Sequence, residues 1–286
     1  MTPNLRGSLF MIASMAGFAV EDAFLKAASR HVPVGEAILI MGLVGATVFA
    51  LFALRAGLMP IPAGIMSRTM VLRSVSEIGG RLFYSLAIAL TPLSVTSAIL
   101  QATPLLVVLG AAVLFGERVG PGRWALILLG FVGVLVILRP GLAGFDALSL
   151  LAVAGMIGFA GRDLATRAAP LTLSNTQLGV MGFVMLALSG AVILVVGGGA
   201  TMPNLPAVAL ITGAAVFGIA AYAALTAAMR SGDIATVTPF RYTRLLFALL
   251  LGVVVFGEHP DTLTLLGSAI IVACGALILT QGRRIA

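Results

Sequence analysis

Long hydrophobic stretches alternate with short polar breaks along almost the whole chain. A helix needs roughly 20 mostly apolar residues to span a bilayer core of about 30 Å, and most stretches have about this length. Charged residues, prolines and glycines divide them into ten candidate transmembrane helices. We place these helices at residues 7–27, 34–54, 70–90, 93–115, 122–139, 147–167, 173–196, 206–229, 235–256 and 262–281.

The composition indicates that these segments face lipid. Hydrophobic residues make up 60% of the 286 residues and charged residues only 9%, with a mean hydropathy of +1.16. A soluble domain carries about 25% charged residues, because its surface must face water. We therefore predict an all-α polytopic membrane protein without a separate soluble domain.

The net charge of +7 comes from scattered arginines and does not indicate nucleic-acid binding. At the ends of the predicted spans, nine Lys or Arg residues fall on the side of the N-terminus and three on the other, with five inside the spans. Because positive charge gathers on the cytoplasmic side, we expect both termini in the cytoplasm of a bacterium, with the chain in the inner membrane. The first stretch lacks a small-residue cleavage site, so we expect it to be retained.

The two halves of the chain resemble each other. Phe115-Gly116-Glu117 recurs as Phe256-Gly257-Glu258, each time after an apolar span and before the last span of its half. Residues 1–141 and 142–286 each hold five predicted spans, and an odd number makes the second half enter the membrane inverted. Inverted repeats are how many secondary transporters obtain two conformations, open to opposite sides.

The chain resembles the EamA family of the drug/metabolite transporter superfamily. The resemblance rests on the span count, on the Gly-Glu pairs after the fourth and ninth spans, on Thr103-Pro104, and on the run from Phe131 to Gly141. It implies a transporter of small metabolites, and within the family the chain is most similar to aromatic amino-acid exporters. Other members of the family import cofactors such as S-adenosylmethionine or riboflavin, which remains the alternative.

The third span carries Arg73, Glu77 and Arg81, which lie four residues apart and so on one helical face. A charge at the centre of a helix in lipid costs at least about 2.5–3.5 kcal/mol, so such residues face a cavity or a partner. In one hypothesis Glu77 and Arg81 bind a zwitterion, and Phe83 and Tyr84 stack against it. In the other, Arg73 extends to the cytoplasmic surface and Glu77 bridges Arg73 and Arg81.

The ninth span carries Arg241, Tyr242 and Arg244, with both arginines on one face. An arginine can bind a carboxylate through two hydrogen bonds, or extend to lipid phosphates; we favour a cavity. Pro239 after Thr238 predicts a bend with free backbone carbonyls. With Gln101 in the fourth span and Tyr222 in the eighth, the predicted substrate-binding residues are Glu77, Arg81, Phe83, Tyr84, Gln101, Tyr222, Arg241, Tyr242 and Arg244.

Other polar residues inside the spans have less direct interpretations. We interpret Arg162 and Asp163 as a clamp to a neighbouring helix, and we expect Glu21 and Asp22 at the outer mouth, paired with Lys26. Glycines at 155, 158 and 161 indicate close helix approach. Cys274, the only cysteine, lies in an apolar run and indicates neither a disulfide nor a metal site.

The leading hypothesis is a secondary transporter that works as a monomer by alternating access, with a small molecule as substrate and the lipid bilayer as its other partner. No P-loop is present, so we expect no use of ATP by the chain itself. An intramembrane lipid-processing enzyme is the alternative from another class, but neither a His-Glu-x-x-His nor a Gly-x-Ser-x-Gly motif supports it. A channel lacks a recognisable filter sequence. We expect no cofactor and no metal.

Overall fold

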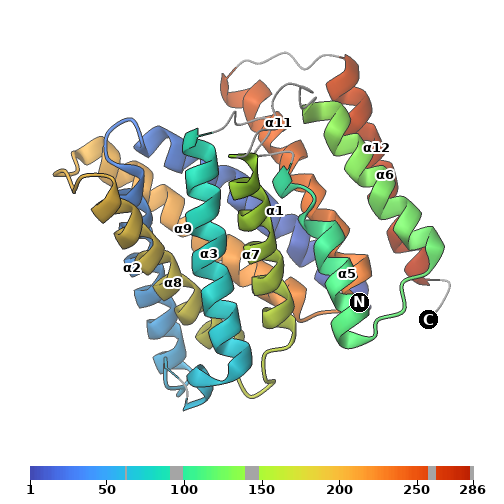
Figure 1. Cartoon of the computed structure of the whole chain (residues 1–286), viewed down its shortest axis with the longest axis horizontal. Coiled ribbons are helices and arrows are strands. Elements are labelled where there is room, and N and C mark those ends of the chain that lie inside the picture. Colours follow the sequence, from blue (N-terminus) through green and yellow to red (C-terminus); the bar gives the residue numbers. More distant parts are fainter. Residues whose placement is uncertain (62, 91–98, 139–147, 257–261, 284–286) are drawn as a thin grey trace.

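The structure is a computed structural model of the whole chain, and it describes all residues except 62, 91–98, 139–147, 257–261 and 284–286 (Figure 1). The described residues form helices and connecting turns, with no strand among them. In chain order the helices are α1 (Pro3–Ala28), α2 (Val34–Arg55), η1 (Ala63–Met66), α3 (Arg68–Leu90), α5 (Thr103–Phe115), α6 (Pro121–Leu138), α7 (Ser149–Arg167), α8 (Asn175–Val196), α9 (Leu205–Met229), α10 (Ile234–Val237), η2 (Thr238–Tyr242), α11 (Thr243–Phe256) and α12 (Thr262–Arg283).

Most predicted spans match one of these helices to within a few residues. The fourth span, predicted from residue 93, is described from residue 99 onward, and its regular part is α5. The predicted turn at Thr91-Pro92 and the second copy of the Phe-Gly-Glu motif at Gly257-Glu258 lie outside the described residues.

The ninth span is broken into three pieces, as Pro239 predicted. The short α10 passes into the 3-10 helix η2 and then into α11. Proline has no N–H to donate to the preceding turn, and its ring clashes with the carbonyl four residues earlier. The break turns the segment around Arg241 into a tighter helix next to the centre of the bundle.

Local sequence signals explain several helix ends. Ser174 and Gln177 form a capping box at the start of α8, and Asn204 accepts the N–H of Ala207 at the start of α9. Gly116 ends α5 with a φ of 67°, a left-handed conformation that suits glycine. These ends place the polar loops outside the long apolar helices.

The helix packing repeats itself between the two halves. The first helix of the first half, α1, packs on α9, and the first helix of the second half, α7, packs on α3. Likewise α1 contacts α11 as α7 contacts α5, and α2 contacts α9 as α8 contacts α3, while α2 pairs with α8 and α6 with α12. The paired α6 and α12 run in opposite directions (Figure 1).

The packing of α3 on α7 is close, as the glycine spacing predicted. A Cβ on Gly158 would lie 2.5 Å from the Cα of Gly80, and one on Gly155 would lie 3.0 Å from the backbone N of Tyr84. The backbones can approach this closely because no side chain separates them. This contact sets the polar faces of α3 and α7 directly against each other.

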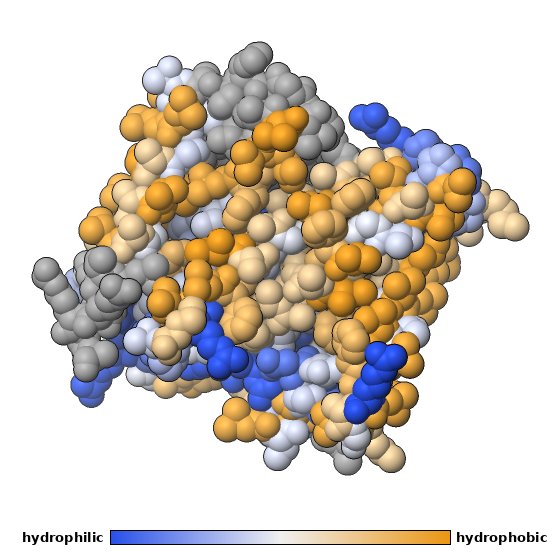
Figure 2. Space-filling model, turned by 180° about the vertical axis from the view of Figure 1, so that it is seen from behind, coloured by the Kyte–Doolittle hydropathy of each residue, from blue (hydrophilic) through white to orange (hydrophobic). Residues whose placement is uncertain are grey.

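The outer surface of the bundle is largely apolar. Figure 2 shows a broad hydrophobic face with hydrophilic residues gathered toward its lower edge and one upper corner. Large side chains such as Val113, Val195 and Val254 are 73%, 81% and 72% exposed. Within the described residues, four helices are long and apolar enough to cross a membrane: α1, α2, α8 and α9. Such a surface is what lipid contact requires.

Candidate functional site

A cavity lies at the centre of the bundle, where helices of both halves meet. Its empty space is about 750 Å³ when its open side is counted. Its walls come from α1, α3, the start of α5, α7, α9, η2 and α11. The polar residues that line it are Glu21, Asp22, Arg81, Tyr84, Gln101, Thr103, Arg162, Tyr222, Arg241 and Arg244.

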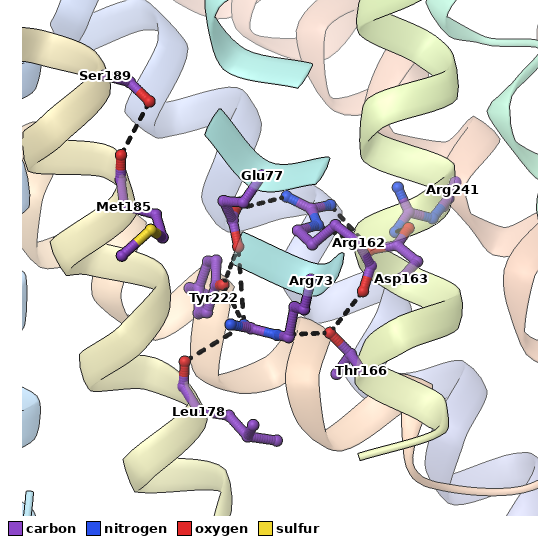
Figure 3. A network of polar contacts seen from close by, with 10 residues as sticks. All are labelled: Arg73, Glu77, Arg162, Asp163, Thr166, Leu178, Met185, Ser189, Tyr222 and Arg241. Carbon is purple, nitrogen blue, oxygen red and sulfur yellow. Dashed lines mark hydrogen bonds and ion pairs between the residues drawn. The ribbon is translucent and has the colours of Figure 1, made fainter. Parts of the chain in front are cut away.

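Next to the cavity, a network of charged side chains is buried between α3, α7, α8 and α9 (Figure 3). Arg73 is fully buried, and its guanidinium donates to the Thr166 hydroxyl at 3.0 Å, to the Leu178 carbonyl at 3.2 Å and to the Tyr222 hydroxyl at 2.6 Å. Tyr222 in turn donates to Glu77 Oε2 at 2.6 Å. The network therefore joins four helices.

Arg162 connects this network to Asp163 and, through it, to Arg241. Its Nη1 lies 3.2 Å from Glu77 Oε1, and its Nε donates to Asp163 Oδ1 at 2.9 Å. Asp163 also forms an ion pair with Arg241 on η2. Each of these two carboxylates therefore contacts arginines from more than one direction, which offsets the cost of burying charge.

Two nitrogen atoms of the network are available to donate a further hydrogen bond. Arg73 Nη1 and Arg241 Nε are buried, and within the described part of the chain neither has a hydrogen-bond partner. Arg241 lines the cavity, whereas Arg73 lies behind Tyr222. A buried donor without a partner is costly, so an oxygen atom entering the cavity beside Arg241 would be favoured.

The more exposed end of the cavity carries a second set of charges. Arg244 on α11 contacts Asp22 on α1, with Nε 3.2 Å from Oδ2, and its guanidinium lies 5.4 Å from the centre of the Phe18 ring. The Asp22 side chain is 54% exposed. Glu21, its neighbour in sequence, is only 5% exposed and lines the cavity.

The structure brings six of the nine predicted binding residues to the cavity wall: Arg81, Tyr84, Gln101, Tyr222, Arg241 and Arg244. Glu77 lies one layer behind it, in contact with Tyr222 and Arg162. Phe83 is 41% exposed on the outside of α3 and does not line the cavity. Tyr242 is buried against α6 and α12, packed with Val134 and Ile271, and its hydroxyl lies 3.4 Å from the Ile127 carbonyl.

Helical periodicity explains the positions of Phe83 and Tyr242. Phe83 is two residues from Arg81, and Tyr242 directly follows Arg241, so neither can share a face with its cavity-lining neighbour. Sequence proximity to a polar residue was the wrong signal for these two aromatic residues.

One further interpretation of the sequence was wrong, and two others gain detail. Arg73 does not extend to the surface, because it is fully buried, and Glu77 bridges Arg73 and Arg162 instead of Arg73 and Arg81. Asp22 pairs with Arg244, and the side chain of Lys26 lies outside the described part of the structure. Arg162 and Asp163 clamp α7 to its neighbours as expected, through Glu77 and Arg241, and Arg162 also lines the cavity.

The sequence reasoning missed the contribution of the first helix of each half to the cavity. Met15, Phe18 and Glu21 come from α1, and Phe159 and Arg162 come from α7. Charges inside these spans were the available signal, since a charge within an apolar span faces a cavity or a partner.

Comparison with known proteins decides the family. The EamA-like transporter family matches the chain twice, over residues 5–139 and 145–280. The chain belongs to this family. Its helical bundle with two matching packing arrangements agrees with the two family repeats.

Two relatives and one solved structure illustrate the relationship. A riboflavin transporter of Rhizobium johnstonii is 30% identical over 198 residues, which are 69% of this chain and 65% of that protein. The pseudopaline exporter CntI of Pseudomonas aeruginosa is 26% identical over 279 residues, 96% of each chain. A crystal structure with 22% identity superimposes with a TM-score of 0.81 over 98% of both chains, so the fold is shared. The names of these two relatives specify riboflavin and pseudopaline, and neither specifies an amino acid.

Proposed function

We propose that this EamA-family protein is a secondary transporter that exports amino acids, including aromatic and other hydrophobic ones, by alternating access. The observation that carries the proposal is the central cavity, in which four arginines and several aromatic side chains face one another between the two halves.

The charge balance of the site favours a substrate with a carboxylate. The cavity and the adjoining network hold five arginines (Arg73, Arg81, Arg162, Arg241 and Arg244) but four carboxylates (Glu21, Asp22, Glu77 and Asp163). The excess positive charge lies in a site largely shielded from water, where an anion interacts strongly with it. A substrate carboxylate would supply the missing negative charge.

The aromatic residues of the cavity favour an apolar or aromatic side chain on that substrate. The Tyr84 and Phe159 rings are edge to face with their centres 5.8 Å apart, and Phe18 also lines the cavity. Aromatic pairs contribute about 0.5–1.5 kcal/mol beyond the area that they bury. A substrate ring could extend this cluster.

Alternating access follows from the repeat. We propose that residues 1–141 and 142–286 are inverted five-helix halves, which is supported by the repeated packing arrangement and by the opposed directions of α6 and α12. The cavity lies where the halves meet, which is the usual position of a transporter site. Rocking of one half against the other would expose the cavity to each side in turn.

The proposed orientation places both termini in the cytoplasm of the inner membrane. A reporter that is active only in the cytoplasm should be active when fused after Arg284 and inactive when inserted in the loop 197–204. The reverse pattern would contradict both the orientation and the charge rule behind it.

Transport itself is tested with purified protein in liposomes without ATP. The expected result is movement of labelled phenylalanine, with smaller hydrophobic amino acids moving more slowly. Riboflavin and S-adenosylmethionine serve as the alternative substrates. Movement of either one, with none of any amino acid, would replace the proposed substrate class by cofactor import while leaving the family function intact.

A further inference from the structure

Glu21 is a buried carboxyl group on the cavity wall. It lies near the end of α1, is 5% exposed, and faces the cavity on one side. Helix α9 covers its other side, since a Cβ on Gly218 would lie 3.2 Å from the Glu21 Cδ atom. Glu21 is therefore shielded from water except through the cavity.

Glu21 also differs from the other buried acids in its partners. Glu77 and Asp163 each contact arginines, and Glu36 accepts the backbone N–H and the hydroxyl of Thr201. Within the described part of the chain, Glu21 forms no hydrogen bond and no ion pair within 4.0 Å. A buried carboxylate without such a partner is costly, so a cation or a proton at this position is favoured.

The charged groups that act on Glu21 come from three helices. They are Arg81 on α3, Arg244 on α11 and Asp22, its neighbour on α1, and Tyr84 and Tyr222 line the same cavity. Arginine does not lose its proton in proteins. Asp22 is half exposed and already contacts Arg244, so Glu21 is the carboxyl group of this cavity that is left for a new occupant.

We propose that Glu21 binds the ammonium group of the substrate in exchange for a proton. The inference rests on the proposed function and assigns the substrate amine to one atom group. When the ammonium binds, the O–H proton of the Glu21 carboxylic acid leaves to water, and the carboxylate pairs with the ammonium. The site therefore holds a proton or an ammonium, but not both.

This competition gives the transporter a direction. A carrier that crosses the membrane with either occupant exchanges one for the other, so protons that enter the cell move amine-bearing substrate out. The arginines of the cavity bind the substrate carboxylate at the same time, which separates the two ends of a zwitterion between Glu21 and the arginine-rich wall.

Binding of three matched probes to the purified protein in detergent tests the proposal. Phenethylamine carries only the ammonium, 3-phenylpropionate only the carboxylate, and L-phenylalanine both. Acidification should weaken the binding of phenethylamine and L-phenylalanine by up to about tenfold per pH unit, because protons compete with the ammonium group. A pH-indicator dye should report proton release when either probe binds. Glu21→Gln should weaken the binding of these two probes about ten- to a hundredfold and abolish the proton release, but should not weaken the binding of 3-phenylpropionate.

Matched variants keep the test decisive. Glu36→Gln changes an equally buried glutamate outside the cavity and should leave all three affinities unchanged. Asp22→Asn should retain the proton release, which separates Glu21 from its neighbour. Glu21→Asp should still release protons on binding, with a weaker affinity. Retained binding of 3-phenylpropionate by Glu21→Gln shows that the loss in this variant is not a failure to fold.

The outcomes separate this inference from the proposed function. If L-phenylalanine is transported without proton release and Glu21→Gln binds it normally, the role of Glu21 is wrong and amino-acid export stands. If phenethylamine competes with protons but no amino acid is transported, the role of Glu21 stands and the substrate class is wrong. Failure of both ammonium probes to bind the wild-type protein would overturn the inference.

Discussion

In the buried network, Glu77 contacts both Arg73 and Arg162, and water is nearly absent, since these side chains are at most 9% exposed. At the outer end of the cavity, Asp22 is 54% exposed and holds Arg244, while Glu21 has no ion pair among the described residues. The two regions use the same residue types. Breaking a buried pair leaves an uncompensated charge, whereas an exposed pair contributes little. We infer that the network holds the helices together, whereas the charged side chains at the outer end of the cavity can exchange one binding partner for another.

The largest expected effect comes from breaking the network at Arg73. Arg73→Met removes the donor to the Thr166 and Tyr222 hydroxyls and to the Leu178 carbonyl, and one of the two arginines paired with Glu77. It should lower the free energy of unfolding by about 3–5 kcal/mol. Thermal unfolding of the detergent-solubilised protein measures this. Arg68→Met, at an exposed position on the same helix, should change it little. If the two variants lowered the free energy of unfolding equally, the buried network would not be the region that stabilises the fold.

At the outer end of the cavity the effect should appear in transport instead of stability. Arg81→Ala or Arg244→Ala should weaken transport about ten- to a hundredfold, because a hydrogen bond to a charged group contributes about 1.5–3 kcal/mol. Uptake into liposomes at matched protein content measures the loss, with Arg68→Ala as control. Normal transport by both variants would place the carboxylate site elsewhere.

One substitution should disturb both regions together. In Gly158→Ala the added Cβ would lie 2.5 Å from the Gly80 backbone, so α3 and α7 must move apart. We expect a loss of about 1–3 kcal/mol of stability, as for other overpacked sites, together with reduced transport. Gly161→Ala meets only the Ser76 side chain at 2.9 Å and should have a smaller effect. Unfolding and uptake of the two variants are compared directly.

The aromatic wall gives a smaller and selective effect. Tyr84→Ala should weaken transport of phenylalanine by about 0.5–1.5 kcal/mol in apparent binding, and transport of alanine less. Phe83→Ala, on the outside of the same helix, should not change this ratio. Competition assays with both amino acids provide the measurement, and an unchanged ratio in Tyr84→Ala would exclude stacking against this ring.

The smallest effect concerns Glu117, in the loop after α5. Burial raises the pKa of Glu117, although Arg167, 3.5 Å away, lowers it. The folded chain therefore binds this proton more tightly than the unfolded chain does. The cost of ionisation is absent below the ordinary pKa of glutamate and complete above the raised one. Relative to Glu117→Gln, the Tm of the wild type should fall as the pH rises through this window; a constant difference would contradict this.

Much of the fold could be predicted because each span carries its own signal. Apolar length marks the helices, and Pro239 marks the break in the ninth span. Arg81, Tyr84, Gln101, Tyr222, Arg241 and Arg244 could be selected as cavity residues because polar groups inside apolar spans avoid lipid. The face that each one occupies follows from helical periodicity, which Phe83 and Tyr242 show by pointing elsewhere.

The partner of each charge could not be predicted in this way. Four-residue spacing suggested that Glu77 joins Arg73 and Arg81, but the close glycine contact of α3 with α7 brings Arg162 to Glu77. Asp22 and Arg244, 222 residues apart, meet because α1 packs on α11.

The sequence by itself determined the spans, the two repeats, the family resemblance and the residues that had to avoid lipid, because each depends on local composition and spacing. The tertiary structure decided which of those residues form ion pairs or hydrogen bonds with one another and which one faces the cavity without such a partner. That choice depends on the backbone distance between helices far apart in the chain. At Glu21, it leaves a buried carboxyl group that faces a cavity and forms no ion pair within 4.0 Å among the described residues.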